Sequence, residues 1–235
     1  MRPSISLVVP AYNEEAGLSA TVERCLKTLR ACADDYELII LDDCSRDRTP
    51  DIMEQIRQTD PTHIRTARHA VNLGIAATFE DLYRMSTKEY VFLTPGDGEY
   101  PPEALLDCAK LIPEYDIVAC VRTAKNYTVY RQIVSYCYRL LPLILFGVDL
   151  RDPGGTKCMR RSIITDTPVI CRSVFVEAER VIRAVRSGKK LAMVEIRHEV
   201  RAGGKARGAR LETVLRAASD VWRLRWDLWM HPNRM

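Results

Sequence analysis

The chain has 235 residues, of which 47% are apolar and 28% are charged, and its formal net charge is +4. This length and apolar content suit one globular α/β domain with a modest extension rather than several domains. The longest apolar run, 140–148, is interrupted by Pro142 and is far shorter than the roughly 20 residues that cross a bilayer, so we expect no transmembrane helix.

The first residues and the cysteines indicate a cytoplasmic chain. A short apolar stretch ends at Pro10 and is soon followed by Glu14 and Glu15, which a signal peptide would not contain. The eight cysteines include no C-x-x-C pair and mostly lie in apolar patterns, which favours buried thiols over zinc ligands or disulfides. Free thiols fit a reducing compartment, and we therefore expect a cytoplasmic protein.

Short β-branched runs alternate with helical patterns along the chain. Strands are expected at Ser6–Val9, Glu37–Leu41, Tyr90–Leu93, Ile117–Val121 and Met193–His198. Helices are expected to begin at Asn13, Thr49 and Pro101–Glu103, and to cover Tyr130–Phe146 and Leu211–Trp229. The alternation predicts an α/β fold, with a mainly parallel sheet flanked by helices and a C-terminal amphipathic helix. The expected domain covers 1–207, with halves 1–121 and 122–207, and the terminal helix lies in 208–235.

The first two expected strands each end in polar residues. The first is followed by Pro10–Glu15, which lacks the G-x-G-x-x-G loop that binds a dinucleotide pyrophosphate. The second ends at Asp42 and Asp43. Because open α/β sheets bind ligands at the carboxyl ends of their strands, these carboxylates are placed to accept hydrogen bonds from a nucleobase or a ribose. The alternative is that Asp42 is a loop acid and that Asp47 and Thr49 only cap the next helix.

The strand at 90–93 is followed by a glycine-rich loop with one central carboxylate. Asp97 lies between Gly96 and Gly98, and the loop continues to Pro101 and Pro102. Glycines let a carboxylate approach a metal ion and a diphosphate without side-chain crowding. Mg²⁺ commonly takes one or two protein carboxylates and completes its shell with water and phosphate oxygens, so Asp97 alone is chemically sufficient. The alternative is a simple turn before a proline-started helix.

Together, these loops resemble those of the inverting glycosyltransferases of family 2. The matching motifs are P-A-Y-N-E-E at 10–15, D-D-C-S-R-D-R-T at 42–49, N-L-G at 72–74 and P-G-D at 95–97. The resemblance implies a GT-A fold, a UDP- or GDP-linked sugar donor, and Mg²⁺ or Mn²⁺. The residues that it places at the donor nucleotide are Pro10, Tyr12, Glu14, Asp42, Asp43, Asn72, Gly74 and Lys205.

One departure from the family concerns the metal loop, because Pro95 stands where the first aspartate of D-A-D is usual. We expect Asp97 to hold the metal ion, helped by Glu99. The alternatives are a weakened dependence on metal, or a protein that binds a sugar nucleotide without turning it over.

The second half resembles, within family 2, the polyprenyl-phosphate glycosyltransferases such as dolichyl-phosphate mannose synthase. The resemblance rests on 121–122, 130–135, 151–161 and 198–207. It implies that Arg122, Arg131 and Ser135 hold an acceptor phosphate. Arg131 and Ser135 are four residues apart on an expected helix, so a guanidinium and a hydroxyl would face one anion. The alternative is that these arginines are solvated surface residues.

The acceptor decides which residues take part in catalysis. Asp97 with its cation, and Arg201 or Lys205, are expected to neutralise the departing diphosphate. A phosphate acceptor has a second pKa near ~6, so it is a nucleophile at neutral pH and requires no general base. A hydroxyl acceptor would require one, and Asp152 is the candidate. The alternative function is therefore a soluble glycosyltransferase that acts on a small hydroxylated acceptor such as a natural product.

The C-terminal part of the chain is basic and carries an aromatic stripe. Residues 180–235 contain 14 Lys or Arg against 5 Asp or Glu, which favours an anionic partner. Helical spacing places on one face Leu211, Leu215, Ala218, Trp222, Trp226 and Trp229, with Arg216, Arg223 and Arg225 beside them. We expect this helix to dock peripherally on the inner face of an anionic membrane. The alternative is packing on its own domain or on a second subunit of a homodimer. No nucleic acid is expected among the partners.

Overall fold

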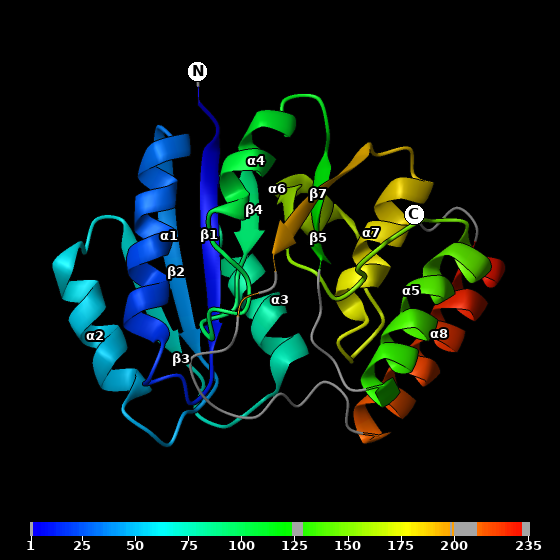
Figure 1. The fold of residues 1–235 in the computed structure, drawn as a ribbon, viewed down its shortest axis with the longest axis horizontal. Helices are drawn as coiled ribbons and strands as arrows, with labels where there is room; N and C mark the ends of the chain where they lie inside the picture. Colours follow the sequence, from blue (N-terminus) through cyan, green and yellow to red (C-terminus); the bar gives the residue numbers. More distant parts are fainter. Residues whose placement is uncertain (1, 124–128, 198, 200–210, 232–235) are drawn as a thin grey trace.

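A computed structural model of the chain describes residues 2–123, 129–197, 199 and 211–231. Within these residues, seven strands form one sheet in the order β3-β2-β1-β4-β6-β5-β7 (Figure 1). The strands are β1 (Ser4–Ala11), β2 (Asp35–Asp42), β3 (Ile64–Arg68), β4 (Tyr90–Leu93), β5 (Ile117–Thr123), β6 (Lys157–Arg160) and β7 (Leu191–Arg197). The helices are α1 (Leu18–Cys32), α2 (Thr49–Thr59), α3 (Ile75–Met85), α4 (Ala104–Leu111), α5 (Val129–Phe146), α6 (Arg161–Asp166), α7 (Val176–Arg186) and α8 (Leu211–Met230).

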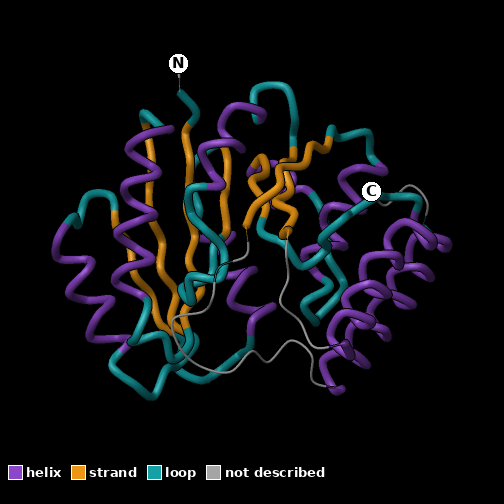
Figure 2. Tube along the Cα trace, viewed as in Figure 1, coloured by secondary structure: helices purple, strands orange, loops and turns teal. Residues whose placement is uncertain are grey.

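The sheet is parallel except at β6, which runs antiparallel to β4 and β5. This arrangement confirms the expected α/β fold with a mainly parallel sheet and a C-terminal helix. Each face of the sheet has its own core: Leu7 of β1 packs with Leu18 of α1, and Val8 packs with Leu82 of α3. Successive side chains of a strand point to opposite faces, so a strand covered on both sides reads as one apolar run. Figure 2 shows α5 and α8 side by side at the end of the molecule opposite α2.

The expected helix start at Asn13 is wrong. Asn13 has a φ of 55°, in the left-handed region, and α1 begins only at Leu18. The Asn13 side chain accepts a hydrogen bond from the Arg46 N–H at 2.9 Å, so it serves a neighbouring loop and not a helix. The other starts are confirmed, because α2 begins at Thr49 and α4 begins directly after Glu103.

The cysteines are free thiols, and six of the eight are buried, as expected. The exceptions are Cys137, which is exposed, and Cys44, which is half-buried. Burial raises the pKa of Cys32 to about 11 and that of Cys25 still further, so these thiols act as small apolar core residues.

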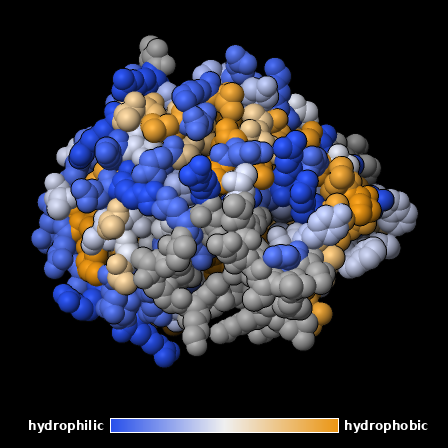
Figure 3. Space-filling model, viewed as in Figure 1, coloured by the Kyte–Doolittle hydropathy of each residue, from blue (hydrophilic) through white to orange (hydrophobic). Residues whose placement is uncertain are grey.

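Helix α8 packs on the domain through one face and leaves its tryptophans in solvent. The residues on its buried face are Ala217, Val221, Leu224 and Leu228. Trp222, Trp226 and Trp229 are 66%, 63% and 64% exposed. The alternative that this stripe packs on its own domain is therefore wrong. Figure 3 shows apolar residues over the end of α5 and residues of intermediate hydropathy over the C-terminal end of α8.

Buried ion pairs attach α8 to α7. Arg183 Nε donates to Glu179 at 2.8 Å, and both side chains are almost completely buried. Arg183 Nη2 donates to Asp227 of α8 at 2.5 Å. Glu179 also accepts the backbone N–H groups of Ile170 and Cys171. One buried arginine and one buried glutamate thus hold the terminal helix and the segment before α7.

Replacement of Arg183 by alanine should destabilise the fold strongly. The change leaves the buried Glu179 carboxylate without its cation, and breaking such a pair typically costs about 3–5 kcal/mol. Arg223→Ala is the control, because the half-exposed Arg223 contacts Asp220 at 3.4 Å. That variant should lose less than about 1 kcal/mol. Urea unfolding followed by circular dichroism measures both changes, and equal losses would contradict the role of Arg183.

Candidate functional site

Three of the motif loops meet at the carboxyl edge of the sheet. Ala11 pairs with Asp42 at the last step of the β1–β2 ladder, so the first two loops begin level with each other. The third loop continues beside β1, because the Gly96 N–H donates to the Pro10 carbonyl oxygen at 3.2 Å. The position of these loops agrees with the place where open α/β sheets bind ligands.

The first two loops are joined by hydrogen bonds between backbone and side chains. The Asn13 N–H donates to Ser45 Oγ at 2.8 Å, and the Glu14 N–H donates to Thr49 Oγ1 at 2.9 Å. The side chains of Tyr12 and Glu14 are half-buried beside this contact, whereas Pro10 is buried in β1. The two loops therefore form one continuous surface.

Asp42 is buried and orders the second loop. Its carboxylate accepts hydrogen bonds from the Ser45 N–H at 3.0 Å and from Ser45 Oγ, and it pairs with Arg68 Nε at 3.0 Å. Asp47 accepts the Thr49 N–H at 3.0 Å, so the capping alternative holds in part for Asp47. Sequence reasoning missed Arg68, which a strand at 64–68 would have placed at this edge.

Asp43 binds the N-x-G loop. Its two carboxylate oxygens accept the Leu73 N–H and the Gly74 N–H, each at 2.8 Å. Asn72 Nδ2 donates to the Asp43 carbonyl oxygen at 2.9 Å. His69 Nδ1 lies 2.8 Å from Asp43 Oδ1, a contact that the sequence patterns do not predict. The structure thus brings together Asp43, Asn72 and Gly74, three residues expected at the nucleotide, and shows that the Asp43 carboxylate holds their loop.

The loop around Asp97 leaves little room for a side chain at Gly96 and has a positive φ at Gly98. A Cβ on Gly96 would lie 3.2 Å from Leu18 Cδ1 and 3.4 Å from the Pro10 carbonyl oxygen. Gly98 has a φ of +73°, which other residues rarely adopt. Asp97 Oδ1 accepts the Glu99 N–H at 3.0 Å. Among the described residues, no group of three His, Cys, Asp or Glu side chains could hold a metal ion. The role of Asp97 and Glu99 as metal ligands stays a prediction.

Arg122 and Asp152 form a paired contact. Arg122 Nε and Nη2 donate to the two Asp152 oxygens at 2.7 and 2.9 Å. The Arg122 guanidinium also lies over the Tyr100 ring, 4.8 Å from its centroid, and Tyr100 donates to the Gly154 carbonyl oxygen at 2.8 Å. The predicted acceptor-phosphate ligand and the predicted base are therefore bound to each other, and Asp152 orients Arg122.

The remaining predicted residues are placed only in part. Ser135 is half-buried on α5. Arg131 lies on the same helix, but its side chain is outside the described residues. Arg201 and Lys205 lie outside the described residues altogether. Their expected roles stay predictions.

A buried lysine supports the loop that contains Asp152, and sequence reasoning missed it. Lys157 Nζ donates to the carbonyl oxygens of Pro153 at 3.1 Å and Gly155 at 2.6 Å. Burial lowers the pKa of Lys157, while Glu177 and Asp152 act in the opposite direction. The lysine satisfies two carbonyl groups that the loop turns inward.

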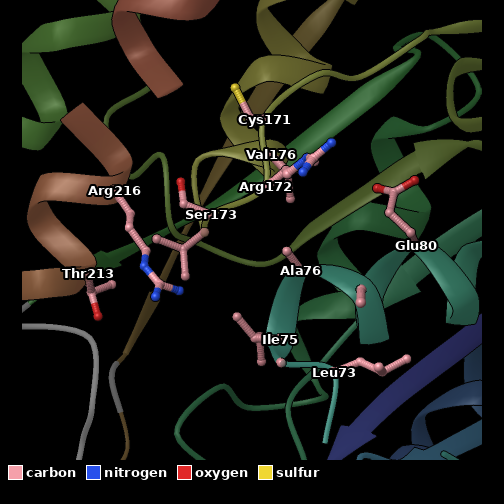
Figure 4. A pocket seen from close by; sticks show the side chains of 13 residues that line it. Leu73, Ile75, Ala76, Glu80, Cys171, Arg172, Ser173, Val176, Thr213 and Arg216 are labelled. Carbon is pink, nitrogen blue, oxygen red and sulfur yellow. The ribbon is translucent and has the colours of Figure 1, made fainter. Parts of the chain in front are cut away.

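A separate cavity lies beside the N-x-G loop (Figure 4). It has a volume of about 520 Å³ and is bounded by 73–77 at the start of α3, by 171–174 and by the first turns of α8. Asp220 accepts the N–H groups of Arg172 and Ser173 at 2.9 and 2.8 Å, which fixes one wall. Leu73 and Gly74 line the opposite wall, so the cavity adjoins the loop held by Asp43.

Substitution of Gly155 tests the loop around Asp152. A Cβ at Gly155 would lie 2.2 Å from the Cys120 carbonyl oxygen, so Gly155→Ala forces the backbone to move. Overpacking of this kind costs about 1–3 kcal/mol. The neighbouring Gly154→Ala is the control, because its Cβ would meet only the Arg122 side chain at 3.8 Å. Thermal unfolding should separate the two variants, and a Gly155→Ala protein as stable as Gly154→Ala would contradict the packing described.

Comparison with known proteins gives a family match. Residues 6–167 match the profile of the family described as "Glycosyl transferase family 2". Undecaprenyl-phosphate 4-deoxy-4-formamido-L-arabinose transferase of Pectobacterium carotovorum subsp. carotovorum (strain PC1) is 24% identical over 214 residues, which are 90% of this chain and 64% of the relative. The protein of the same name from Pseudomonas aeruginosa (strain LESB58) is 28% identical over 211 residues, 86% of this chain and 60% of the relative. The chain therefore spans less than two thirds of the length of these curated relatives.

Solved structures are similar in fold. Glucosyl-3-phosphoglycerate synthase of Mycobacterium tuberculosis, in complex with Mn²⁺, UDP and phosphoglyceric acid, matches with a TM-score of 0.74 and 18% identity, over 95% of this chain and 78% of that chain. TarS 1–349 of S. aureus in complex with UDP matches with a TM-score of 0.62 and 17% identity, over 83% of this chain and 60% of that chain.

Proposed function

Because the chain belongs to glycosyl transferase family 2, we propose that it moves a sugar from a nucleoside diphosphate to a polyprenyl phosphate, with inversion at the anomeric carbon. The fold is the GT-A fold, as the likeness to solved structures indicates. The observation that carries the proposal is the meeting of loops 10–15, 42–49 and 95–97 at one sheet edge, with Asp97 between two glycines.

In this proposal the donor lies over the first two loops. Tyr12 and Glu14 border the nucleoside, and Asp42 and Asp43 act through the loops that their buried carboxylates hold. The diphosphate reaches the loop of Asp97. The donor is UDP- or GDP-linked, in line with the structural neighbours bound to UDP.

The carboxylates of Asp97 and Glu99 are hard oxygen ligands of the kind that Mg²⁺ and Mn²⁺ prefer. A divalent ion held by Asp97, with help from Glu99, would offset the negative charge on the departing diphosphate. A single protein carboxylate is sufficient where phosphates and water complete the shell, so Pro95 does not oppose this role. The solved neighbour in complex with Mn²⁺ and UDP supports a divalent ion.

The acceptor phosphate is proposed to lie at Arg122, Arg131 and Ser135. One of its oxygens forms the bond to the anomeric carbon as the bond to the nucleoside diphosphate breaks. A phosphate dianion needs no base, which agrees with Asp152 being occupied by Arg122. In this proposal Asp152 fixes the plane of the Arg122 guanidinium. The names of the two curated relatives, both undecaprenyl-phosphate sugar transferases, support a polyprenyl phosphate as acceptor.

We further propose that the protein reaches such an acceptor by peripheral contact with the inner face of an anionic membrane. No helix in the described part of the chain is long and apolar enough to cross a bilayer. Large exposed apolar side chains gather on two adjacent helices: Tyr136, Leu143 and Ile144 on α5, and Leu215, Trp222, Trp226, Trp229 and Met230 on α8. Exposed arginines flank them at 139, 216, 223 and 225. Aromatic side chains with neighbouring cations are typical of an interfacial helix.

Asp97→Asn should lower kcat about 100-fold or more, because it removes the carboxylate that faces the diphosphate and its cation. Asp107→Asn is the control, since Asp107 is an exposed acid on α4. Products are analysed after incubation with UDP- and GDP-sugars, Mn²⁺, and either undecaprenyl phosphate or small hydroxylated acceptors. An Asp97→Asn protein that keeps most of its activity at saturating Mn²⁺ would overturn the metal assignment.

The same assay separates the alternatives. Transfer that occurs only to hydroxylated acceptors, and is lost in Asp152→Asn, would favour the soluble glycosyltransferase. Donor binding without any product would favour a sugar-nucleotide-binding protein.

The membrane proposal predicts that the chain co-sediments with anionic liposomes at low salt. Liposome binding should fall at least about tenfold in high salt, because salt screens the surface cations. It should fall by a similar factor when Trp226 and Trp229 become alanine, because the helix then loses its apolar contact with the bilayer. Tyr115→Ala, a change of an aromatic residue packed near α4, is the control for loss of an aromatic side chain. Failure of the folded wild-type chain to co-sediment would rule out the membrane role. Dimerisation through the same face would show that this face binds a second copy of the chain.

A further inference from the structure

Arg24 connects two segments on either side of the loop that carries Asp97. Its Nε and Nη2 atoms donate to Glu103 at 2.9 and 2.7 Å. Its Nη1 and Nη2 atoms donate to the two oxygens of Glu199, each at 2.8 Å. Glu103 lies directly before α4, and Glu199 lies just after β7. One guanidinium therefore binds two carboxylates through paired hydrogen bonds, a geometry that Arg can form and Lys cannot.

These contacts close a ring that includes the backbone of the loop. The Glu199 N–H donates to the Glu99 carbonyl oxygen at 3.2 Å, and the Glu99 N–H donates to Asp97 Oδ1 at 3.0 Å. The ring therefore runs from Asp97 through Glu99 and Glu199 to Arg24, and it returns to the same loop through Glu103. The loop is thus held at its middle, through Glu99, and at its C-terminal end, through Glu103.

Helix α1 supports the loop along its length. Leu18, Thr21 and Arg24 follow one another at intervals of three residues, so they lie on neighbouring turns of one side of the helix. A Cβ on Gly96 would lie 3.2 Å from Leu18 Cδ1, and one on Gly98 would lie 3.4 Å from Thr21 Oγ1. The two glycines thus rest on the helix, and Arg24 extends the same row to the far end of the loop.

We propose that Arg24 is a positioning residue, which sets the place of Asp97 relative to the donor diphosphate by clamping Glu103 and Glu199. The inference rests on the proposed function, because it assumes that Asp97 serves the diphosphate. A displacement of a reacting or charge-bearing group by about 1 Å can cost as much as 100-fold in rate, so a brace on this loop has consequences for turnover.

The exposure of the three side chains favours a positioning role over a stabilising one. Arg24, Glu103 and Glu199 are 33%, 46% and 40% exposed, and ion pairs with such exposure contribute little to stability. The hydrogen bonds that Arg24 donates to Glu103 and Glu199 raise the pKa of Arg24, and the bond to Glu103 lowers the pKa of that carboxyl. The contact between Arg24 and Glu103 therefore favours the charged form of both groups.

The test compares Arg24→Ala with Arg57→Ala in the full chain. Arg57 forms the same kind of paired contact with Glu54 on α2, at 2.9 and 2.6 Å, and is 41% exposed, but it lies away from the loop. The Kd of UDP or GDP, whichever the wild-type chain binds, is measured in the presence of Mn²⁺. Arg24→Ala should raise this Kd about tenfold and lower kcat/KM for the sugar donor by at least as much. Arg57→Ala should stay within about twofold of wild type on both measures. Arg24→Lys keeps the charge without the paired contacts and should lie between the two.

Hydrogen exchange provides a measurement that does not depend on activity. The N–H groups of Glu99 and Glu199 close the ring, so both should exchange about tenfold faster in Arg24→Ala and at the wild-type rate in Arg57→Ala. Unchanged exchange at these two groups would overturn the proposal, whatever happens to the affinity. Faster exchange together with unchanged affinity and turnover would overturn it as well. If the wild-type chain binds neither nucleotide, the proposed function fails, and exchange in Arg24→Ala still decides whether Arg24 holds the loop.

Discussion

Parallel pairing of β1 with β2 and β4 is the constraint on which the candidate site depends. The ladder from Ser4–Asp35 to Ala11–Asp42 sets the ends of two strands level, and the Gly96–Pro10 hydrogen bond extends the alignment to the third loop. The strands are buried on both faces, so a slip of one residue would move each apolar side chain into the opposite core. Core packing thereby fixes the relative positions of loops that are far apart in the sequence.

Buried carboxylates then turn this alignment into a rigid site. Asp43 accepts two backbone N–H groups of the N-x-G loop, and Glu179 and Asp220 accept those of four consecutive residues before α7. Burial of a carboxylate without hydrogen-bond donors destabilises the fold, and so does burial of an N–H group without an acceptor. Each of these groups supplies the partner that the other needs. Asp42 and Asp43, which motif reasoning assigns to the nucleotide, are therefore seen to hold loops in this structure.

The sequence predicts the fold class, five of the seven described strands (β1, β2, β4, β5 and β7) and both long helices, because these elements have clear periodicity. It fails at β6, where the run Lys157–Arg160 begins and ends with cations and does not alternate, although Lys157 is buried. It fails at Asn13, because the acidic residues that follow are typical of a helix start while the side chain serves another loop. The pairing of Arg122 with Asp152 depends on a contact between residues thirty positions apart, which no local pattern records.

The face of α8 that points away from the domain has a consequence for optical work on this protein. All three tryptophans of the chain lie on it, each more than half exposed, and two of the indole rings, Trp226 and Trp229, have centroids 5.2 Å apart. Intrinsic tryptophan fluorescence therefore originates from one helix surface and carries almost no signal from the core. Contact of a quencher or a lipid with this surface should therefore change the whole tryptophan fluorescence signal, and no attached dye is needed to detect it.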